Sequence, residues 1–286
     1  MAIVLDNITY TYGMGTPFEK TALRGVSLTI ENGEFLGVIG HTGSGKSTFV
    51  QHLNGLLHPT TGTVTVNGVD ISASTEEAKK MRHKVGMVFQ YPEHQLFEET
   101  IAQDIAFGPK NLGLSADDVD ERVRDAMKFV GLDYDTYAER SPFHLSGGQM
   151  RRVAIAGVVA MDPDFLVLDE PSAGLDPFGR EEIFEEIIRL HKEKGITVIL
   201  VSHNMEDISR MASRLVVLDK GRIVLDGEPM DIFNNHRDEL QAVGVDVPPV
   251  SVTIEYLREQ GLDVSNRVLS VDDAVQAILE GGSHVK

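Results

Sequence analysis

Apolar residues recur along this 286-residue chain with two periods that alternate from one segment to the next. The opening stretch, MAIVLDNITYTY, alternates apolar and polar residues as a half-buried strand does. The runs GEFLGVIG, KVGMVFQ, FLVLD and ITVILVS are almost continuously apolar, which is typical of strands buried in a parallel sheet. Because helical periodicity lies between these runs, we expect a β-rich start followed by a mainly parallel sheet with helices on its faces.

Helical patterns are concentrated in two places. Residues 100–131 predict two helices inserted between core strands, and Ser115 is the N-cap candidate of the second one. The later stretch REEIFEEIIRLHKEKG predicts a helix that ends at Gly195 after several basic residues. We also expect two hairpins, in GTVTVNGVDI and in RLVVLDKGRIVLDG.

The pattern of predicted elements changes after about His236, from alternating strands and helices to a linker and short helices. VGVDVPPV is typical of a turn or linker, and short helices are expected around TIEYLREQG and VDDAVQAIL. We therefore expect a main domain over residues 1–235, with a helical subdomain at about 91–163, and a small C-terminal module over residues 236–286. No internal repeat interrupts this organisation.

Composition narrows the class of function. An apolar content of 42% suits a packed globular core, and a formal net charge of −18 disfavours a nucleic-acid backbone as the general partner. The chain contains no cysteine, so it has neither disulfides nor thiolate chemistry. No apolar run approaches the roughly 18 residues of a membrane span, and the first residues lack a signal-peptide layout. Any membrane role is therefore expected to be peripheral.

The strongest local motif is GHTGSGKST, which satisfies the pattern G-x-x-x-x-G-K-[ST] between a predicted strand and a predicted helix. Its glycines let successive N–H groups converge on an anion, and the helix N-terminus adds positive potential. Lys46 would reach the β- and γ-phosphates, and Ser47 would bind Mg²⁺. The expected nucleoside triphosphate site comprises Gly40, His41, Thr42, Gly43, Ser44, Gly45, Lys46, Ser47 and Thr48.

Two carboxylates follow the strand FLVLD directly. Asp169 and Glu170 would lie at the carboxyl edge of the sheet, where open α/β sheets bind ligands. Asp169 would belong to the magnesium shell and Glu170 would act as general base on the attacking water. His203 follows another strand and would reach the same edge, near a γ-phosphate. Taken singly, these residues could be solvated strand ends, so the interpretation depends on their combination.

The order of motifs resembles that of the ATP-binding subunits of ABC transporters. It comprises GHTGSGKST, Gln90 at the end of a strand, LSGGQ, FLVLDE, SAGLD and SHN. The resemblance covers nearly the whole chain and implies an α/β P-loop ATPase fold with a β-rich nucleotide-binding subdomain, a helical subdomain and a C-terminal module. It also implies ATP as the nucleotide, with catalytic roles for Lys46, Gln90, Glu170 and His203.

The same resemblance assigns further roles to residues outside the phosphate loop. Ser146, Gly147 and Gly148 would contact the ATP bound to the opposite subunit of a head-to-tail dimer. Asp176, at the end of SAGLD, is also expected to bind nucleotide. Gln90 would sense Mg²⁺ and water, and Tyr12 would stack on adenine. Tyr10 alternates with Tyr12 on the same strand, so an aromatic residue there could equally be part of the core.

The stretches YGMGTPFEKTAL, FQYPEHQLFEETIAQDIAFGPKN and LSGGQMRRVAIAGVVAMDP narrow the resemblance. They are similar to the ATPases of energy-coupling factor transporters, which import vitamins and metal ions, and most of all to the second A-type ATPase. This resemblance implies a heterodimer with a paralogous ATPase, a transmembrane coupling protein and a substrate-binding membrane protein as partners. It also implies a peripheral location on the cytoplasmic face of the cell membrane, with residues 236–286 as a candidate dimerisation region.

The sequence disfavours two other classes of function. An ABC-type ATPase acting on nucleic acid or ribosomes would need a tandem cassette, long coiled-coil arms or basic stripes, and the sequence has none of these. A nonhydrolytic, ATP-gated assembly switch is disfavoured by the presence of Glu170 in its catalytic position. The sequence does not identify the transported substrate, because that selectivity belongs to membrane proteins.

Overall fold

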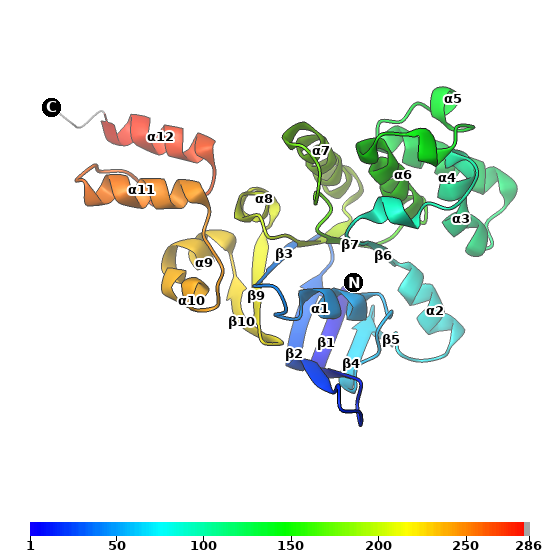
Figure 1. The fold of residues 1–286 in the computed structure, drawn as a ribbon, viewed down its shortest axis with the longest axis horizontal. Helices are drawn as coiled ribbons and strands as arrows, with labels where there is room; N and C mark the ends of the chain where they lie inside the picture. Colours follow the sequence, from blue (N-terminus) through cyan, green and yellow to red (C-terminus); the bar gives the residue numbers. More distant parts are fainter. Residues whose placement is uncertain (283–286) are drawn as a thin grey trace.

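The protein, described here from a computed structural model over residues 1–282, is built on two sheets flanked by helices (Figure 1). The main sheet has six strands in the order β10-β9-β3-β8-β7-β6. Five of them run parallel, and β10 pairs antiparallel with β9 at one edge. The bounds are Phe35–Ile39 (β3), Val85–Val88 (β6), Phe165–Asp169 (β7), Thr197–Val201 (β8), Arg214–Asp219 (β9) and Arg222–Gly227 (β10). Strands β3, β6, β7 and β8 are buried at every position, which explains their unbroken apolar runs.

The second sheet is antiparallel and has four strands in the order β2-β1-β4-β5. Its strands are Ala2–Tyr12 (β1), Lys20–Glu31 (β2), Thr61–Val66 (β4) and Val69–Asp70 (β5). Burial alternates along much of β1 and β2, because one face packs on the core and the other meets solvent. Both hairpins expected from the sequence form, β4 with β5 and β9 with β10.

Helices cover the sheets and fill the long insertion between β6 and β7 (Figure 1). The insertion carries η1, α3, α4, α5, η2 and α6, and Ser115 caps α4 as expected. The helical elements are Lys46–Leu53 (α1), Glu76–His83 (α2), Pro92–Gln95 (η1), Ile101–Asn111 (α3), Ala116–Phe129 (α4), Tyr134–Tyr137 (α5), Pro142–His144 (η2), Gly147–Val159 (α6), Pro177–Lys194 (α7), Met205–Met211 (α8), Pro229–Asn235 (α9), Arg237–Ala242 (α10), Pro249–Glu259 (α11) and Val271–Gly282 (α12).

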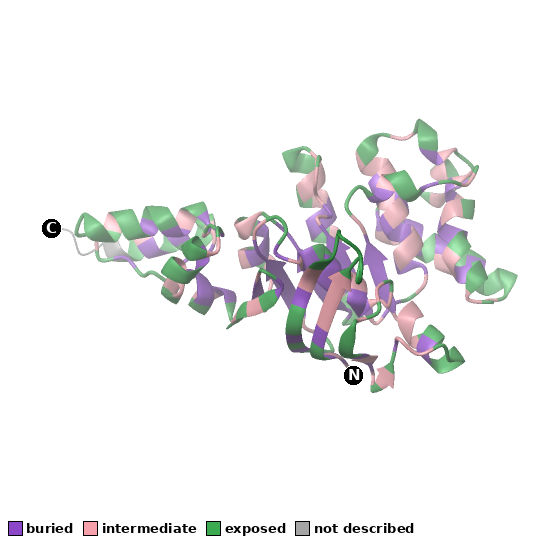
Figure 2. Ribbon diagram, turned by 60° about the horizontal axis from the view of Figure 1, so that its bottom comes forward, coloured by how far each residue is buried: buried purple, intermediate pink, exposed green. Residues whose placement is uncertain are grey.

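Two large apolar clusters lie on opposite faces of the main sheet, because their members alternate along its strands. Apart from β10, the strands of this sheet are coloured almost entirely as buried in Figure 2. One joins this sheet to the antiparallel sheet and to α1 through residues such as Leu36, Phe49 and Val167. The other packs the opposite face against the helices of the insertion and against α7 to α9. Strands β3, β7 and β8 contribute to both clusters, so their carboxyl ends are held by packing on both sides.

The C-terminal helices α11 and α12 have a small apolar cluster of their own, which includes Ile254, Val268 and Ala277. In contrast, Leu240 of α10 and Val245 belong to the large cluster of the main sheet. The hydroxyl of Ser209 in α8 donates to the carbonyl of Leu269, linking the C-terminal helices to the main body. The domain boundary at residues 235/236 stays a prediction.

The structure contains several short helices that the sequence pattern does not predict, namely α2, α8, α9 and α10. Each is only six to eight residues long, too short for a periodic apolar stripe to stand out. A cap signal for α2 was available, because Thr75 precedes two glutamates and its hydroxyl accepts a hydrogen bond from the Ala78 amide. Among residues 1–282, no helix is both long enough and apolar enough to cross a bilayer.

Candidate functional site

The loop between β3 and α1 owes its conformation to glycine. Gly40, Gly43 and Gly45 have φ of +152°, +84° and +111°, which residues with a Cβ rarely adopt. A Cβ on Gly40 would lie 2.3 Å from the Leu218 carbonyl oxygen, so the loop passes strand β9 too closely for a side chain. This backbone leads directly into α1, where the first amides of a helix are available to an anion.

Lys46, the first residue of α1, lies back against its own loop. Its ammonium donates to the carbonyl oxygens of Gly40 at 2.7 Å and His41 at 3.1 Å. Burial lowers the pKa of Lys46, while the two carboxylates at the end of β7 oppose that change. His41 lies with its Nε2 3.0 Å from Asp219 Oδ1, which ties the loop to the end of β9.

Strands β7 and β8 bring the predicted catalytic residues to one edge. Asp169 ends β7 and is paired in register with Val201 at the end of β8, two residues before His203. Glu170 has a φ of +52°, in the left-handed region, and its amide donates to the Val201 carbonyl at 3.0 Å. His203 Nε2 lies 3.5 Å from Glu170 Oε1, and that buried oxygen receives no hydrogen bond from the described residues.

At this edge of the sheet, burial shifts the pKa values of the ionisable side chains toward their neutral forms. Burial raises the pKa of Asp169, and the Ser47 hydroxyl and Lys46 ammonium oppose the rise. Burial, reinforced by the Asp169 carboxylate, raises the pKa of Glu170 from 4.5 to about 7. Burial also lowers the pKa of His203, so its imidazole is neutral near pH 7. A carboxyl with a pKa near neutrality is suited to accepting a proton from water.

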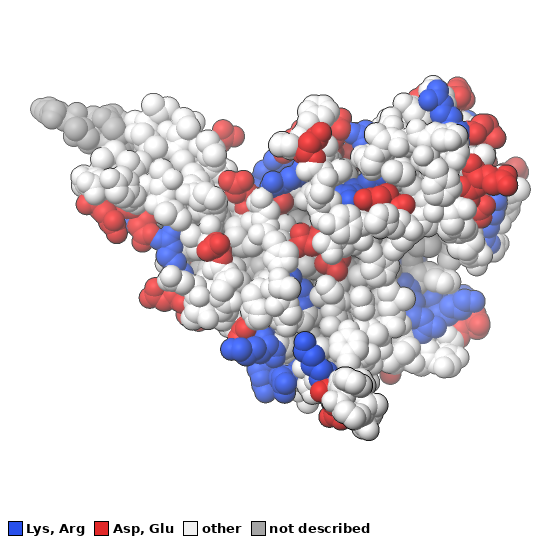
Figure 3. Space-filling model, in the orientation of Figure 1, with Lys and Arg blue, Asp and Glu red and all other residues white. Residues whose placement is uncertain are grey.

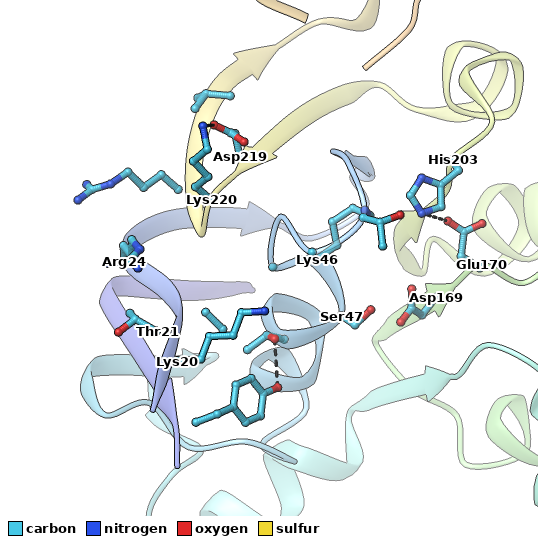
Figure 4. Close-up of a pocket in the computed structure, with 18 of the residues that line it drawn as sticks. Lys20, Thr21, Arg24, Lys46, Ser47, Asp169, Glu170, His203, Asp219 and Lys220 are labelled. Carbon is cyan, nitrogen blue, oxygen red and sulfur yellow. Dashed lines mark hydrogen bonds and ion pairs between the residues drawn. The ribbon is translucent and has the colours of Figure 1, made fainter. Parts of the chain in front are cut away.

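These groups line one cavity of about 960 Å³ (Figure 4). Lys46 and Ser47 approach it from α1, while Asp169, Glu170 and His203 approach from the ends of β7 and β8. Among the residues expected at the site, Gly40, His41 and Ser44 shape the loop without lining the cavity. The expected residues that do line it are Tyr12, Thr42, Gly43, Gly45, Lys46, Ser47, Thr48, Gln90, Asp169, Glu170 and His203.

The oxygen donors at the inner end of the cavity fit Mg²⁺ bound together with a triphosphate. Ser47 and Asp169 face one another there (Figure 4), and the exposed Gln90 also lines the cavity. Mg²⁺ is usually held by one or two protein oxygens plus phosphate oxygens and water, rather than by a full protein cage. The residues present therefore fit the ion expected from the sequence.

Tyr12 lines the cavity at the end of β1. Its hydroxyl lies 3.1 Å from the Thr48 hydroxyl, and its ring is 40% exposed. The ring of Tyr10 packs edge-on against it with centroids 4.7 Å apart, so Tyr10 supports the ring that borders the cavity. Adenine stacking by Tyr12 stays a prediction.

The signature residues lie outside this cavity, at the start of α6. Ser146 caps α6 in a capping box with Gln149. A Cβ placed on Gly147 or Gly148 would meet no atom of the described part of the chain within 4 Å, and neither glycine has positive φ. The fold of this chain therefore does not require glycine at either position. Asp176, also outside the cavity, caps α7 by accepting from the Gly179 amide at 2.7 Å.

Sequence reasoning missed the outer wall of the cavity, which is formed by β2 and the β9–β10 hairpin. In a chain of net charge −18, this wall carries four cationic side chains. Blue atoms gather over these elements at the lower edge of the molecule in Figure 3. The only available signal was the basic character of two short stretches, which says nothing about their proximity. The missed lining residues are Lys20, Thr21, Ala22, Arg24, Asp219, Lys220, Arg222 and Val224.

Comparison with known proteins agrees with this geometry. The family model described as ABC transporter matches residues 23–173. The chain is 53% identical over 280 residues to the energy-coupling factor transporter ATP-binding protein EcfA2 of Clostridium tetani, covering 98% of this chain and 97% of that one. It is 52% identical over 280 residues to the protein of the same name from Clostridium perfringens, with 98% of both chains covered.

Solved structures give the same picture. The chain resembles cbiO1 from Clostridium perfringens, part of the ABC transporter complex cbiONQ, with a TM-score of 0.74 and 34% identity over 90% of this chain and 98% of that one. It also resembles the ATP-binding cassette MJ0796, in a dimeric post-hydrolysis state bound to ADP and Pi. That likeness has a TM-score of 0.70 and 31% identity over 79% of this chain and 98% of the other.

Proposed function

The chain belongs to the ABC transporter family and, within it, to the ATP-binding subunits of energy-coupling factor transporters, and on this premise we propose the roles of its residues and partners. It is an ATPase that powers an energy-coupling factor importer. The main support for the roles of its residues is that one cavity is lined by the phosphate loop, Gln90 and the residues at the ends of β7 and β8. These groups match the parts that phosphoryl transfer to water requires.

In the proposed reaction, the loop amides and Lys46 hold the β- and γ-phosphates. Mg²⁺, bound by Ser47 and Asp169, would neutralise charge on the phosphate oxygens. Glu170 orients the attacking water and accepts its proton through Oε1, a buried oxygen that receives no hydrogen bond from residues 1–282. The neutral imidazole of His203 contacts the γ-phosphate, and Gln90 senses Mg²⁺ and the attacking water.

The signature at the start of α6 would serve a nucleotide on another chain. Among the described residues, nothing lies close enough to Gly147 or Gly148 to require glycine, and the two residues begin α6, where the first amides of a helix can bind an anion. A phosphate approaching this backbone closely would supply the missing reason for two glycines. We therefore propose a head-to-tail heterodimer with a paralogous ATPase, in which each composite site uses one phosphate loop and the other chain's signature.

The membrane partner would bind next to Gln90. The segment Tyr91–Phe97 follows it directly, and the rings of Tyr91 and Phe97 are exposed. Phe97 meets the exposed Phe107 of α3 edge-on, with ring centroids 4.9 Å apart. Exposed aromatic side chains are enriched where protein partners bind. We propose that this surface contacts a transmembrane coupling protein that assembles with a substrate-binding membrane protein, which holds the chain at the cytoplasmic face of the membrane.

Two variants separate the composite sites in the assembled complex. Lys46→Ala should abolish nucleotide trapping at the site built on this chain's loop. Gly147→Asp should instead reduce trapping on the partner's loop, because the carboxylate would face a γ-phosphate where only glycine permits a close approach. Photolabelling of each subunit with an ATP analogue measures both sites. Asn111→Asp, at the end of α3, is a matched control for added charge.

The labelling pattern decides the arrangement. If Gly147→Asp abolishes labelling of its own chain while the partner is labelled normally, the signature acts within one chain and the head-to-tail arrangement is wrong. Normal labelling of both subunits would exclude a nucleotide contact by Gly147.

A further inference from the structure

Arg151 is a large cationic side chain buried inside the molecule, with only 1% of its surface exposed. It lies on α6, four residues after Gly147. Its guanidinium donates from Nε and Nη2 to the two carboxylate oxygens of Glu93, at 3.1 and 3.0 Å. A second set of bonds runs from Nη1 to the carbonyl oxygens of Pro171 and Ala173, at 2.9 and 2.8 Å.

These bonds join three segments of the chain that have different proposed roles. Glu93 lies in η1, inside the segment proposed to contact the membrane partner. Arg151 belongs to the helix that begins with the signature. Pro171 and Ala173 follow Glu170, and the Ala173 amide donates to the Glu170 carbonyl at 3.1 Å. The guanidinium is therefore one hydrogen bond removed from the backbone of the proposed general base.

The chemistry of arginine makes this connection stiff. A guanidinium is planar, and its donors have fixed relative directions, so a movement of Glu93 at one edge must rotate the donors at the other. Water cannot readily replace these partners, because the group is buried and an unpaired charge there is costly. Lysine could keep the charge but could not hold Glu93 and two carbonyls at once.

We propose that Arg151 is a positioning residue that connects the membrane-contacting segment to the loop of Glu170. Nη1 fixes the Pro171 and Ala173 carbonyls and thereby the orientation of Glu170. The bidentate pair with Glu93 conveys the position of η1 to that loop and to the signature helix. The contact with the membrane partner in this scheme rests on the proposed function.

The first test is Glu93→Gln. This change removes the negative charge and one of the two acceptors for Arg151, and it leaves the bonds from Arg151 Nη1 to Pro171 and Ala173 in place. In the isolated ATPase dimer, kcat and KM for Mg-ATP should stay within about twofold of the unaltered values. In the assembled complex, the change in kcat caused by the membrane partners should fall roughly tenfold, as expected for loss of a charge-assisted hydrogen bond. Glu93→Asp, which keeps the carboxylate, should recover part of that response.

The second test is Arg151→Lys, which removes the bonds to Pro171 and Ala173 as well. Here kcat of the isolated dimer should itself fall roughly tenfold or more, while KM for ATP stays unchanged because the phosphate loop is untouched. Two matched controls are available. Arg152→Lys alters the neighbouring arginine of α6, which pairs with Glu182, and Glu99→Gln alters an exposed glutamate of the same surface region. Both controls should retain basal kcat and the response to the membrane partners.

The pattern across variants separates positioning from simple stabilisation. If the pair only stabilises the fold, both variants lower kcat, raise KM and lower the unfolding temperature together, and the proposal is overturned. It is also overturned if Glu93→Gln responds normally to the membrane partners. The proposed function fails in a distinguishable way, because the unaltered chain would then show no change in kcat on assembly with membrane partners.

Discussion

Glu170 has both an uncommon backbone conformation and a carboxyl group with a raised pKa. Its φ of +52° is uncommon for a residue with a Cβ, and burial raises its pKa to about 7. Such local costs persist only where surrounding structure enforces them, and they are concentrated at functional sites. Here the backbone of Glu170 is held by the hydrogen bond that its amide donates to the Val201 carbonyl, and by the Pro171 and Ala173 carbonyls that Arg151 binds.

We expect Glu170→Gln to separate binding from turnover. ATP affinity should be retained, because the phosphate loop and Asp169 are unchanged, whereas kcat should fall roughly hundredfold or more with loss of the general base. Equilibrium binding of Mg-ATP and steady-state hydrolysis by the complex measure the two quantities. Near-normal hydrolysis would assign the general base to another group.

The same substitution should stabilise the nucleotide-free protein at alkaline pH. The carboxyl titrates near 4.5 when unfolded and near 7 when folded, so the folded state holds the extra proton between these values. The contribution of Glu170 to stability therefore falls as pH rises from 4.5 to 7 and is constant above that range. Each unit of difference between the folded and unfolded pKa corresponds to about 1.4 kcal/mol. The ionised carboxylate of Glu170 therefore lowers the free energy of unfolding by up to about 3 kcal/mol at pH 8.

Glu170→Gln removes this titration. Its free energy of unfolding should exceed that of the unaltered protein at pH 8, and most of the difference should disappear near pH 5. Denaturant unfolding at the two pH values measures it, with Glu99→Gln as an exposed control. An equal gain at both pH values would show that the charge of Glu170 is not the cause.

At the scale of elements, the insertion between β6 and β7 presents two surfaces with different chemistry. The start of α6 offers bare backbone at Gly147, whereas the segment after β6 offers exposed aromatic rings. The first suits a phosphate and the second suits a protein partner. Arg151 links the two surfaces through the interior of the insertion.

Replacing Tyr91 and Phe97 by alanine should weaken assembly with the membrane partners by more than about tenfold, because exposed aromatic anchors often dominate an interface. ATP affinity of the isolated chain should be unchanged, since neither ring lines the cavity. Copurification and quantitative binding to the membrane subunits measure assembly. Phe143→Ala, at an exposed phenylalanine of η2, is the matched control. Unaltered assembly of the double variant would place the contact elsewhere.

At the scale of the whole molecule, the chain combines one large body with a smaller pair of helices (Figures 1 and 2). In the large body, the main sheet packs on one face against the antiparallel sheet and on the other against helices. The pair α11 and α12 has its own apolar cluster, and Ser209 and Leu269 link it to α8. Since α8 begins two residues after His203, the C-terminal helices touch the element that follows a proposed catalytic residue. We propose that this module contributes to pairing of the ATPase subunits.

Two truncations should differ sharply in stability. A chain ending at Asp246 keeps Leu240 and Val245 in the main core, and we expect it to fold and bind ATP. A chain ending at Asn235 removes both, and loss of a buried leucine alone costs about 2 to 5 kcal/mol. Thermal unfolding with and without Mg-ATP measures the difference. Equal stability of the two chains would show that α10 does not support the core.

The sequence alone determined the features that depend on short stretches of chain. Apolar runs identified the central strands because a parallel sheet buries both faces, and GHTGSGKST identified the phosphate loop because its glycines must adopt positive φ. Asp169, Glu170 and His203 could be anticipated together, because the carboxyl ends of parallel strands share one edge.

Only the tertiary structure decided which distant segments meet. Lys20 and Arg222 line the same cavity although about two hundred residues separate them, and no local pattern encodes that proximity. In the sequence, Arg151 and Arg152 are two adjacent basic residues of one helix. Their local sequence does not indicate which of the two is buried. The fold turns Arg151 toward Glu93 and Pro171 and leaves Arg152 in a half-buried pair with Glu182, because burial depends on packing between elements rather than on residue type.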